Sequence, residues 1–309
     1  MGHVYRESPL RCAVHNSCIR KMVTNDRRLM IAWLARGALA NTPPRGAGKD
    51  GEYFDFLEQW PISNVCGTSL VTYGGAPLRE GDPPKRVCES SAGLHENKCW
   101  VLSIGSRGDF AYESDIVART RCSVQIFDCT GNWSLPPSIA SRAHFHSICL
   151  GPRSESVRSA DTQMLQAFLS WSDLLRHVAA TARSRGGLRQ SFQPALVKMD
   201  VEGFEFSSLG AMLDARHIVG PRGVPFGLPS QIAWEMHMVT YLDPGPPWQK
   251  MRQRTHRTRA PWWQVPKVNA SALVRRLVVE GGYRFVSRLD SKLCPHCTEL
   301  VMVRQDGGG

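Results

Sequence analysis

An acidic turn follows one of the apolar runs of this sequence. In "LVKMDVEGFEF", residues 196–206, the run ends at Asp200, Glu202 follows two positions later, and Gly203 permits a tight turn behind them. A carboxylate at the end of a strand can orient a hydroxyl or amine, accept its proton or bind a metal. Glu202 can instead cap the following helix, which is a purely structural role.

A second apolar run ends in another pair of titratable groups. In "WEMH" the residues Glu235 and His237 are two positions apart, so on a strand they share one face. If this strand neighbours the one that ends at Asp200, the side chains form an acid–base or metal-binding cluster. The alternative is a buried histidine with satisfied hydrogen bonds.

A glycine turn and a distant carboxylate suggest a nucleotide site. "SIGSRGDF" places Gly105 and Gly108 after an apolar run, where they allow a close backbone approach to a ligand. Asp128 ends the next apolar run, at about the spacing from the glycines at which a carboxylate meets ribose hydroxyls. A plain strand-to-helix turn and an acidic loop cap are the structural alternatives.

The stretches between these motifs alternate between two patterns. Short apolar runs typical of buried strands cover 99–105, 123–128, 143–150, 195–200 and 231–237. Helical patterns cover 53–60, 109–120, 162–184, 206–215 and 271–280, and two final runs at 283–290 and 299–304 form a hairpin pair. This order predicts an α/β fold with a doubly wound, mostly parallel sheet and a C-terminal antiparallel hairpin.

The charge of the chain is concentrated in two segments. The net charge of the chain is +11. Residues 1–48 contain eight Lys/Arg and two acids, and residues 250–276 contain eight Lys/Arg and no acid. The rest of the chain therefore has a net charge of about −3. The central domain is therefore not a basic surface built for nucleic acid. We expect a basic arm over 1–48, a lead-in or cover segment over 49–98, and the main domain over 99–309 with a basic, Trp-rich insertion at 244–269.

Taken together, these motifs resemble those of class I S-adenosylmethionine-dependent methyltransferases. "LVKMDVEGFE" resembles the K-[IM]-D-[VI]-E-G-x-E signature of FkbM-like methyltransferases. "CWVLSIGSRGDFAYE", "VQIFD" and "WEMH" resemble a related eukaryotic methyltransferase-like domain family, as does the upstream "GGAPLREGDPPKRVC". The resemblance covers roughly 52–309 and implies a Rossmann-like methyltransferase fold with S-adenosylmethionine as cofactor.

The resemblance also implies roles for individual residues. The residues expected at the cofactor are Ser103, Gly105, Ser106, Gly108, Asp109, Phe110 and, at the ribose, Asp128. Asp200 and Glu202 would face the reacting methyl group or the acceptor, and Glu235 and His237 would line the acceptor side. Ser103 departs from the acid-x-G-x-G-x-G loop of most methyltransferases, because it stands where the acid belongs and one glycine is missing.

The expected activity is O-methylation of a hydroxyl on a small molecule or sugar, with Asp200 or His237 as the base. The altered glycine loop favours one alternative, a catalytically inactive module that keeps the fold. The Trp-rich insertion favours another, binding of RNA or an anionic ligand by stacking and charge.

The ten cysteines suggest no disulfide framework in a chain of 309 residues, and several read as core thiols. Cys88 and Cys99 flank a polar loop and could pair in an oxidising compartment. "CPHC", with Cys294 and Cys297, has zinc-knuckle spacing, but a structural zinc needs four ligands and no second C-x-x-C exists. A redox pair or two core cysteines is favoured, and no metal site or membrane span is expected. A cytoplasmic or organellar location is favoured over the secretory pathway.

Overall fold

A computed structural model of the chain describes residues 53–75, 84–96, 99–158, 165–184, 193–217, 227–240, 263–264, 267–291, 294 and 296–305. These belong to one compact unit, residues 46–309. The predicted arm and most of the predicted Trp-rich insertion lie outside the described residues. Among the described helices, none is long and apolar enough to cross a membrane.

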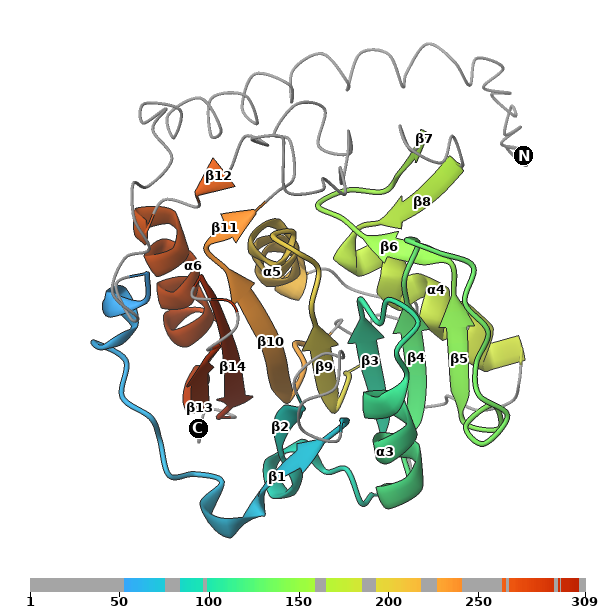
Figure 1. Ribbon diagram of the computed structural model, residues 1–309, viewed down its shortest axis with the longest axis horizontal. Coiled ribbons are helices and arrows are strands. Elements are labelled where there is room, and N and C mark those ends of the chain that lie inside the picture. The colour runs from blue at the N-terminus through green and yellow to red at the C-terminus, as the bar shows by residue number, and fades with distance from the viewer. Residues whose placement is uncertain are drawn as a thin grey trace, which may run out of the picture. The chain divides into compact units, whose positions relative to one another are not determined.

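The centre of this unit is a seven-stranded sheet in the order β13-β14-β10-β9-β3-β4-β5 (Figure 1). Its parallel neighbours are β5 (Ala143–His146), β4 (Ser123–Phe127), β3 (Trp100–Ile104), β9 (Leu196–Met199) and β10 (Gln231–His237). The last strand, β14 (Cys297–Arg304), runs antiparallel to both β10 and β13 (Tyr283–Asp290). The predicted doubly wound sheet with a C-terminal antiparallel hairpin is confirmed.

The strand order places a crevice at the middle of the sheet. From β3 the chain moves outward to β4 and β5 and then returns to β9 on the other side of β3. Ligands of open α/β sheets bind where the order reverses, outside the carboxyl ends of the strands. The strand order differs from that of the dinucleotide-binding fold because the last strand, β14, lies between β10 and β13.

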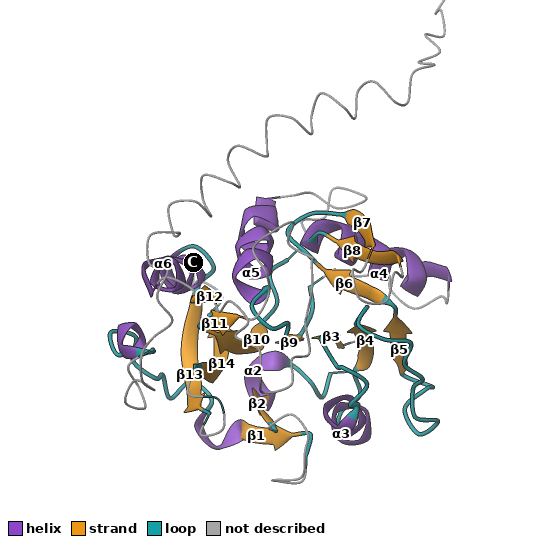
Figure 2. Cartoon of the chain, turned by 45° about the horizontal axis from the view of Figure 1, so that its top comes forward, coloured by secondary structure: helices purple, strands orange, loops and turns teal. Residues whose placement is uncertain are grey.

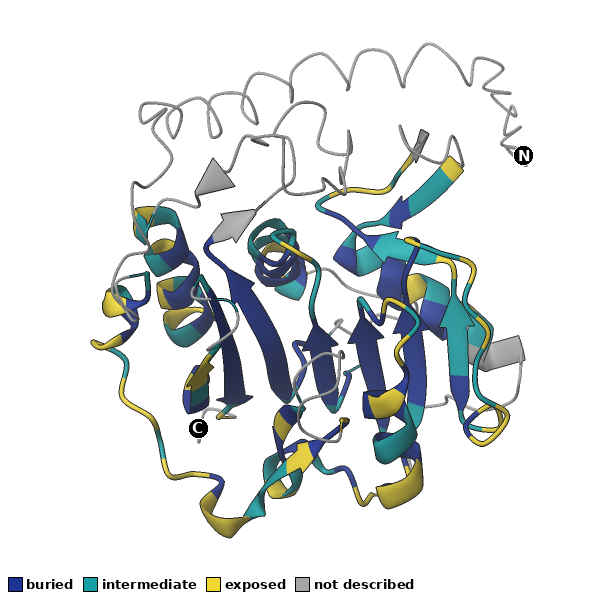
Figure 3. Cartoon of the chain, viewed as in Figure 1, coloured by how far each residue is buried: buried dark blue, intermediate teal, exposed yellow. Residues whose placement is uncertain are grey.

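Each face of the sheet has its own cover (Figures 1 and 2). Helices α4 (Trp171–Ser184), α5 (Glu205–Asp214) and α6 (Lys267–Val279) pack on one face, against alternate strand residues such as Leu102, Ile104 and Trp234. The other face is covered by α3 (Ala111–Arg119), the hairpin β1 (Leu70–Tyr73) and β2 (Lys85–Cys88), and α2 (Glu89–Ala92). The central strands are therefore buried on both faces (Figure 3), which explains their continuous apolar runs.

The predicted helix over 162–184 is wrong in its first part. Leu165–Leu169 is strand β8, which joins β6 (Ile148–Leu150) and β7 (Glu155–Arg158) in a three-stranded sheet. Ser170 separates strand from helix, because its hydroxyl oxygen accepts a hydrogen bond from the Asp173 backbone N–H at 3.3 Å and so caps α4. Pairing with β6 and β7 overrides the helical spacing of the apolar residues here.

Two smaller predictions also need correction. The expected strand over 143–150 is split at Ser147 into β5 and β6, which belong to different sheets. The helix expected over 53–60 is a single 3-10 turn, η1 (Asp55–Leu57). The remaining described elements are short: η2 (Gly67–Ser69), η3 (Ala215–His217), β11 (Val239–Thr240) and β12 (Trp263–Gln264).

Several cysteines predicted as core thiols are instead disulfide-bonded: Cys66–Cys88, Cys99–Cys122 and Cys129–Cys149. Cys294 and Cys297 also form a disulfide, which agrees with the predicted redox pair and not with its alternative of two core cysteines. The expected Cys88–Cys99 pair is wrong because each has another partner. Trp100 and Ser123 are opposite each other in the parallel pair of β3 and β4. The two preceding cysteines are therefore adjacent, with Cα atoms 4.6 Å apart.

Candidate functional site

The glycine turn after β3 lies directly against the end of β9. Gly105 has φ +80°, and a Cβ added there would lie 1.8 Å from the carbonyl oxygen of Asp200. The Gly105 N–H donates to the Phe127 carbonyl at 3.0 Å, and the Gly105 carbonyl accepts a hydrogen bond from Lys198 Nζ. Arg107, in the same turn, has φ +52°. The turn is thus fixed to both neighbouring strands, and Gly105 cannot carry a side chain without displacing backbone.

Asp128 joins the two loops at this edge of the sheet. Its buried carboxylate accepts hydrogen bonds from the Arg107 backbone N–H at 2.6 Å, the Thr130 N–H at 2.7 Å and the Thr130 hydroxyl at 2.6 Å. A carboxylate has about four lone-pair sites, so it keeps the capacity to accept from a ligand as well.

A carboxylate from helix α3 contacts the serine that stands in place of the acid of the glycine motif. Ser103 is fully buried, and its hydroxyl donates to Glu113 Oε1. Burial raises the pKa of Glu113, opposed by the nearby Lys198 and by the Ser103 hydrogen bond. The other carboxylate oxygen of Glu113 is buried and has no hydrogen-bond partner among the described residues. The sequence motif contains this glutamate, but only the fold shows that it reaches Ser103.

The remaining residues predicted for the cofactor contact the turn or the core of the protein. Asp109 Oδ1 accepts a hydrogen bond at 2.9 Å from the N–H of Ala111, the first residue of α3. Ser106 is buried beside it in the turn. Phe110 lies in the core, with its ring centroid 6.2 Å from that of Phe145.

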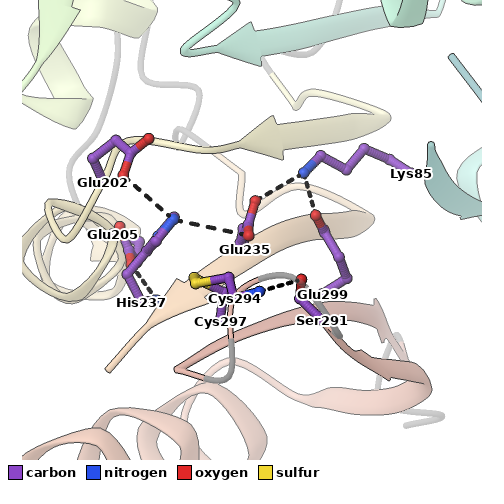
Figure 4. Close-up of a disulfide and its surroundings, with 9 residues drawn as sticks. All are labelled: Lys85, Glu202, Glu205, Glu235, His237, Ser291, Cys294, Cys297 and Glu299. Atoms are coloured by element: carbon purple, nitrogen blue, oxygen red, sulfur yellow. Dashed lines mark hydrogen bonds and ion pairs between the residues drawn. A yellow bond between two sulfur atoms is a disulfide. The ribbon is translucent and has the colours of Figure 1, made fainter. Parts of the chain in front are cut away.

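The predicted acid–base residues come together around a lysine that sequence reasoning missed. Lys85 Nζ, on the covering strand β2, lies 3.2 Å from Asp200 Oδ2. It also lies 3.2 Å from Glu235 Oε2 and forms an ion pair with Glu299 (Figure 4). All four side chains are about nine-tenths buried or more. Because β2 and β14 lie far from β9 in sequence, no local signal points to this lysine or to Glu299.

These contacts set the charge of each group. Burial disfavours the charge on Lys85, but the three carboxylates hold its pKa well above the ordinary value. Burial also disfavours the Asp200 carboxylate, yet Lys85 and Lys198 hold its pKa well below the usual range. Burial and the neighbouring Asp200 raise the pKa of Glu235 to about 8. Near neutral pH the cluster therefore holds a charged lysine, an ionised Asp200 and a protonated Glu235.

His237 connects this cluster to a second pair of carboxylates (Figure 4). Its Nδ1 lies 3.0 Å from Glu205 Oε1, and its Nε2 lies 3.6 Å from Glu202 Oε2 and 3.9 Å from Glu235 Oε1. Burial lowers the pKa of His237, but Glu205 and the other carboxylates outweigh it and raise the pKa to about 10. The histidine is therefore a cation at neutral pH, and Glu205 fixes the orientation of its ring.

Glu202 is the accessible member of the group. Its side chain is 50% exposed, and its backbone has φ +53°, a conformation that costs energy outside glycine. Burial of its carboxyl raises its pKa, with the charge of His237 opposing that shift. Asp200, Glu202 and His237 also bring one ligand atom each within 4.8 Å of one another. The structure thus brings all four predicted acid–base residues into one cluster at the carboxyl edge.

The sequence profile of a family described as a methyltransferase domain matches residues 46–218, more than half of the chain. The chain belongs to this methyltransferase family. Its methyl donor is S-adenosylmethionine, and the sheet order described above is a Rossmann-like methyltransferase fold. The match confirms the resemblance to class I methyltransferases without singling out the FkbM-like group.

Comparison with solved structures finds proteins of low sequence identity. A fibrillarin pre-rRNA processing protein of Methanococcus jannaschii is 9% identical over 76% of this chain and 82% of its own, with a TM-score of 0.34. CalO1, a methyltransferase in calicheamicin biosynthesis, is 10% identical over 70% of this chain and 52% of its own, with a TM-score of 0.32. A 16S rRNA (adenine(1408)-N(1))-methyltransferase from Catenulisporales acidiphilia is 14% identical over 77% of this chain and 98% of its own, with a TM-score of 0.31. Comparison with curated protein sequences gave no match.

Proposed function

We propose that this methyltransferase domain methylates a hydroxyl group of a small molecule or sugar, with Glu202 as the base. The observation that carries the proposal is the position of Glu202: half exposed, at the carboxyl edge of the sheet, beside a histidine cation. A hydroxyl must lose its proton as it is methylated, so such an acceptor needs a base within reach.

The residues around the switch point fit the cofactor. Gly105 leaves no room for a side chain, so the backbone of this turn can approach a ligand closely. Asp128 supports the turn through the Arg107 N–H and keeps acceptor capacity for a ribose hydroxyl. These residues would hold the nucleoside and the methionine part of S-adenosylmethionine, which supplies an electrophilic methyl group on a sulfonium sulfur.

The protonation states select among the candidate bases. Asp200 is a weak base because Lys85 and Lys198 hold its pKa low. Glu235, with a pKa of about 8, and His237, with a pKa of about 10, are protonated near neutral pH and cannot accept another proton. Burial raises the pKa of Glu202 above the ordinary carboxyl value, and Glu202 is the member of the group whose side chain is half exposed to solvent. A base with a raised pKa is better matched to proton transfer near neutrality.

The other members of the cluster would position the reacting groups. The His237 imidazolium, held by Glu205 at 3.0 Å, orients the Glu202 carboxylate through its Nε2. Lys85 fixes Asp200 at 3.2 Å, beside the carbonyl that contacts the glycine turn. Much of the rate enhancement then comes from alignment of donor and acceptor.

The test is methyl transfer from donor carrying a labelled methyl group to a panel of phenols, sugars and amines. We expect hydroxyl acceptors to be methylated, and Glu202→Gln to lower kcat by 10²- to 10⁴-fold, the usual range for loss of a general base. The control is Glu280→Gln, at a glutamate whose side chain is 33% exposed and paired with Arg216 and Arg276 on the surface, which should leave the rate unchanged.

The pH profile separates Glu202 from the alternative bases. With Glu202 as base, the rate rises as its carboxyl ionises, above the ordinary carboxyl pKa, and falls as His237 loses its proton near pH 10. A rate that instead climbs up to pH 10 would assign the base to His237. Turnover of amines alone would overturn the proposal of a hydroxyl acceptor.

A further inference from the structure

The disulfide between Cys294 and Cys297 lies beside the acid–base cluster (Figure 4). Cys297 is the first residue of β14 and is opposite His237 in the antiparallel pairing with β10. The loop before it is fixed to the same strand, since the Met238 N–H donates to the His296 carbonyl at 2.8 Å. The cysteine pair is therefore held at the end of β10, where His237 and Glu235 project.

The sulfur of Cys297 belongs to two groups of potential metal ligands. One group is Cys294, His296 and Cys297, from the loop itself, and the other is Glu235, His237 and Cys297. Within each group the ligand atoms lie within 4.8 Å of one another. The sequence of the loop offers three ligands, and the pairing of β10 with β14 brings further donors to the shared sulfur.

These donors have the chemistry of a zinc site. Thiolate sulfur and imidazole nitrogen are the ligands that Zn²⁺ prefers, in a tetrahedral set of four. Ligand atoms around tetrahedral zinc are roughly 3–4 Å apart, by the Zn–S and Zn–N bond lengths. The two groups share the Cys297 sulfur, and within each group the ligand atoms are already within 4.8 Å of one another. Once the disulfide opens, a local rearrangement around this sulfur would bring Cys294, His296 and His237 to the same ion.

We propose that the reduced Cys294–Cys297 pair forms a zinc site with His296 and His237, and that the disulfide is the oxidised form of this site, which does not bind the metal. A dithiol reductant opens it: two electrons and two protons pass to the sulfurs, the S–S bond breaks, and the reductant becomes a disulfide. Zinc then binds both sulfurs as thiolates and displaces their two protons to solvent. His237 gives up its proton and its place beside Glu202 to become the fourth ligand.

Metal binding would have a consequence for the site described above. That consequence rests on the proposed function, in which His237 orients Glu202. With His237 on the metal, the contact between its Nε2 and Glu202 Oε2, now 3.6 Å, is lost and methyl transfer slows. The metal site itself is tested without any measurement of methyl transfer, so the two proposals can fail separately.

The test uses tag-free full-length protein reduced with a phosphine, which converts the disulfide and one water to two thiols and a phosphine oxide. Co²⁺ is then titrated as a spectroscopic substitute for zinc, followed by Zn²⁺ in competition. We expect one Co²⁺ per chain with a thiolate-to-cobalt charge-transfer band, displaced by Zn²⁺, and no such band before reduction. His237→Gln should weaken binding at least tenfold.

The control is the double variant Cys294→Ser/Cys297→Ser. It retains the other three described disulfides, in which four of the six cysteine residues are buried, and so reports any metal bound by other reduced cysteines. Circular dichroism checks that it is folded. An equal charge-transfer band in this variant, or none in the reduced parent protein, would overturn the proposal. Binding that is unchanged in folded His237→Gln would remove His237 from the ligand set.

Discussion

Replacement of Lys85 by methionine tests whether the buried cluster has the charges assigned to it. The substitution keeps the length and apolar character of the side chain and removes only its cation. Lys85 Nζ is 3.2 Å from Asp200 and from Glu235 and is paired with Glu299, and its side chain is 2% exposed. Lys85→Met therefore leaves three carboxyl groups in the interior without their shared counter-charge.

The structure sets the size of the effect. Two unit charges 3.2 Å apart interact by about 5 kcal/mol at an effective dielectric constant of 20, but desolvation of both groups offsets much of this. Removing one partner of a buried ion pair costs about 3–5 kcal/mol, because the other charge stays buried and unpaired. We expect Lys85→Met to lower the free energy of unfolding by that amount at pH 8.

The loss should depend on pH in a direction that follows from the pKa values. Glu235 has a folded pKa of about 8 against an ordinary value of 4.5, so folding becomes less favourable as the pH rises between these values. Without Lys85 the carboxyl groups are harder still to ionise, and this slope becomes steeper. The difference in stability between parent and variant should thus be smaller at pH 5 than at pH 8.

The assay is urea denaturation of both proteins at pH 5, 6.5 and 8, with disulfides intact. The matched control is Lys267→Met, which removes the same cation from an exposed pair with Asp55 at 2.8 Å and should cost less than about 1 kcal/mol. If Lys85→Met costs no more than Lys267→Met, or its cost is the same at all three pH values, the reasoning is refuted. Addition of Glu299→Gln to Lys85→Met should restore part of the lost stability.

Three further predictions follow from the site and its supports. Asp128→Ala should weaken binding of S-adenosylhomocysteine by about 10- to 100-fold in calorimetric titration, the effect of losing a charged hydrogen bond; unchanged affinity would exclude Asp128 from the site. Gly105→Ala places a Cβ 1.8 Å from the Asp200 carbonyl oxygen at φ +80°, so it should lower the free energy of unfolding by about 1–3 kcal/mol. Its control is Gly210→Ala, in open space on α5, which should raise the free energy of unfolding by about 0.5–1 kcal/mol. Cys99→Ser/Cys122→Ser opens a loop of 23 residues and should cost about 3 kcal/mol in denaturant unfolding; a cost near zero would contradict the chain-entropy argument.

Local patterns in the sequence were sufficient for the central sheet. Four apolar runs that end in glycine, an acid or histidine became parallel strands of this sheet, as did the first half of the run 143–150, because a strand buried on both faces must be apolar throughout. The same logic located Asp128, Asp200 and the pair Glu235 and His237, since the carboxyl ends of parallel strands meet at one edge.

Patterns failed where distant pairing decided the outcome. Leu165–Leu169 has the spacing of a helix, yet pairing with β6 and β7 makes it a strand, and the cap at Ser170 was the local signal for where the helix begins. The disulfide of Cys99 depends on the register between β3 and β4, which no stretch of sequence records.

The sequence by itself determined the methyltransferase fold and the carboxylates at its crevice, because periodicity and strand-end chemistry are local properties. Only the tertiary structure decided which of these groups carry charge. Lys85 reaches them from the covering hairpin and Glu205 from helix α5, and each pKa depends on burial and on partners remote in the chain. The same physics makes His237, one of the two expected bases, a cation, and this is the reason that we propose Glu202 as the base instead.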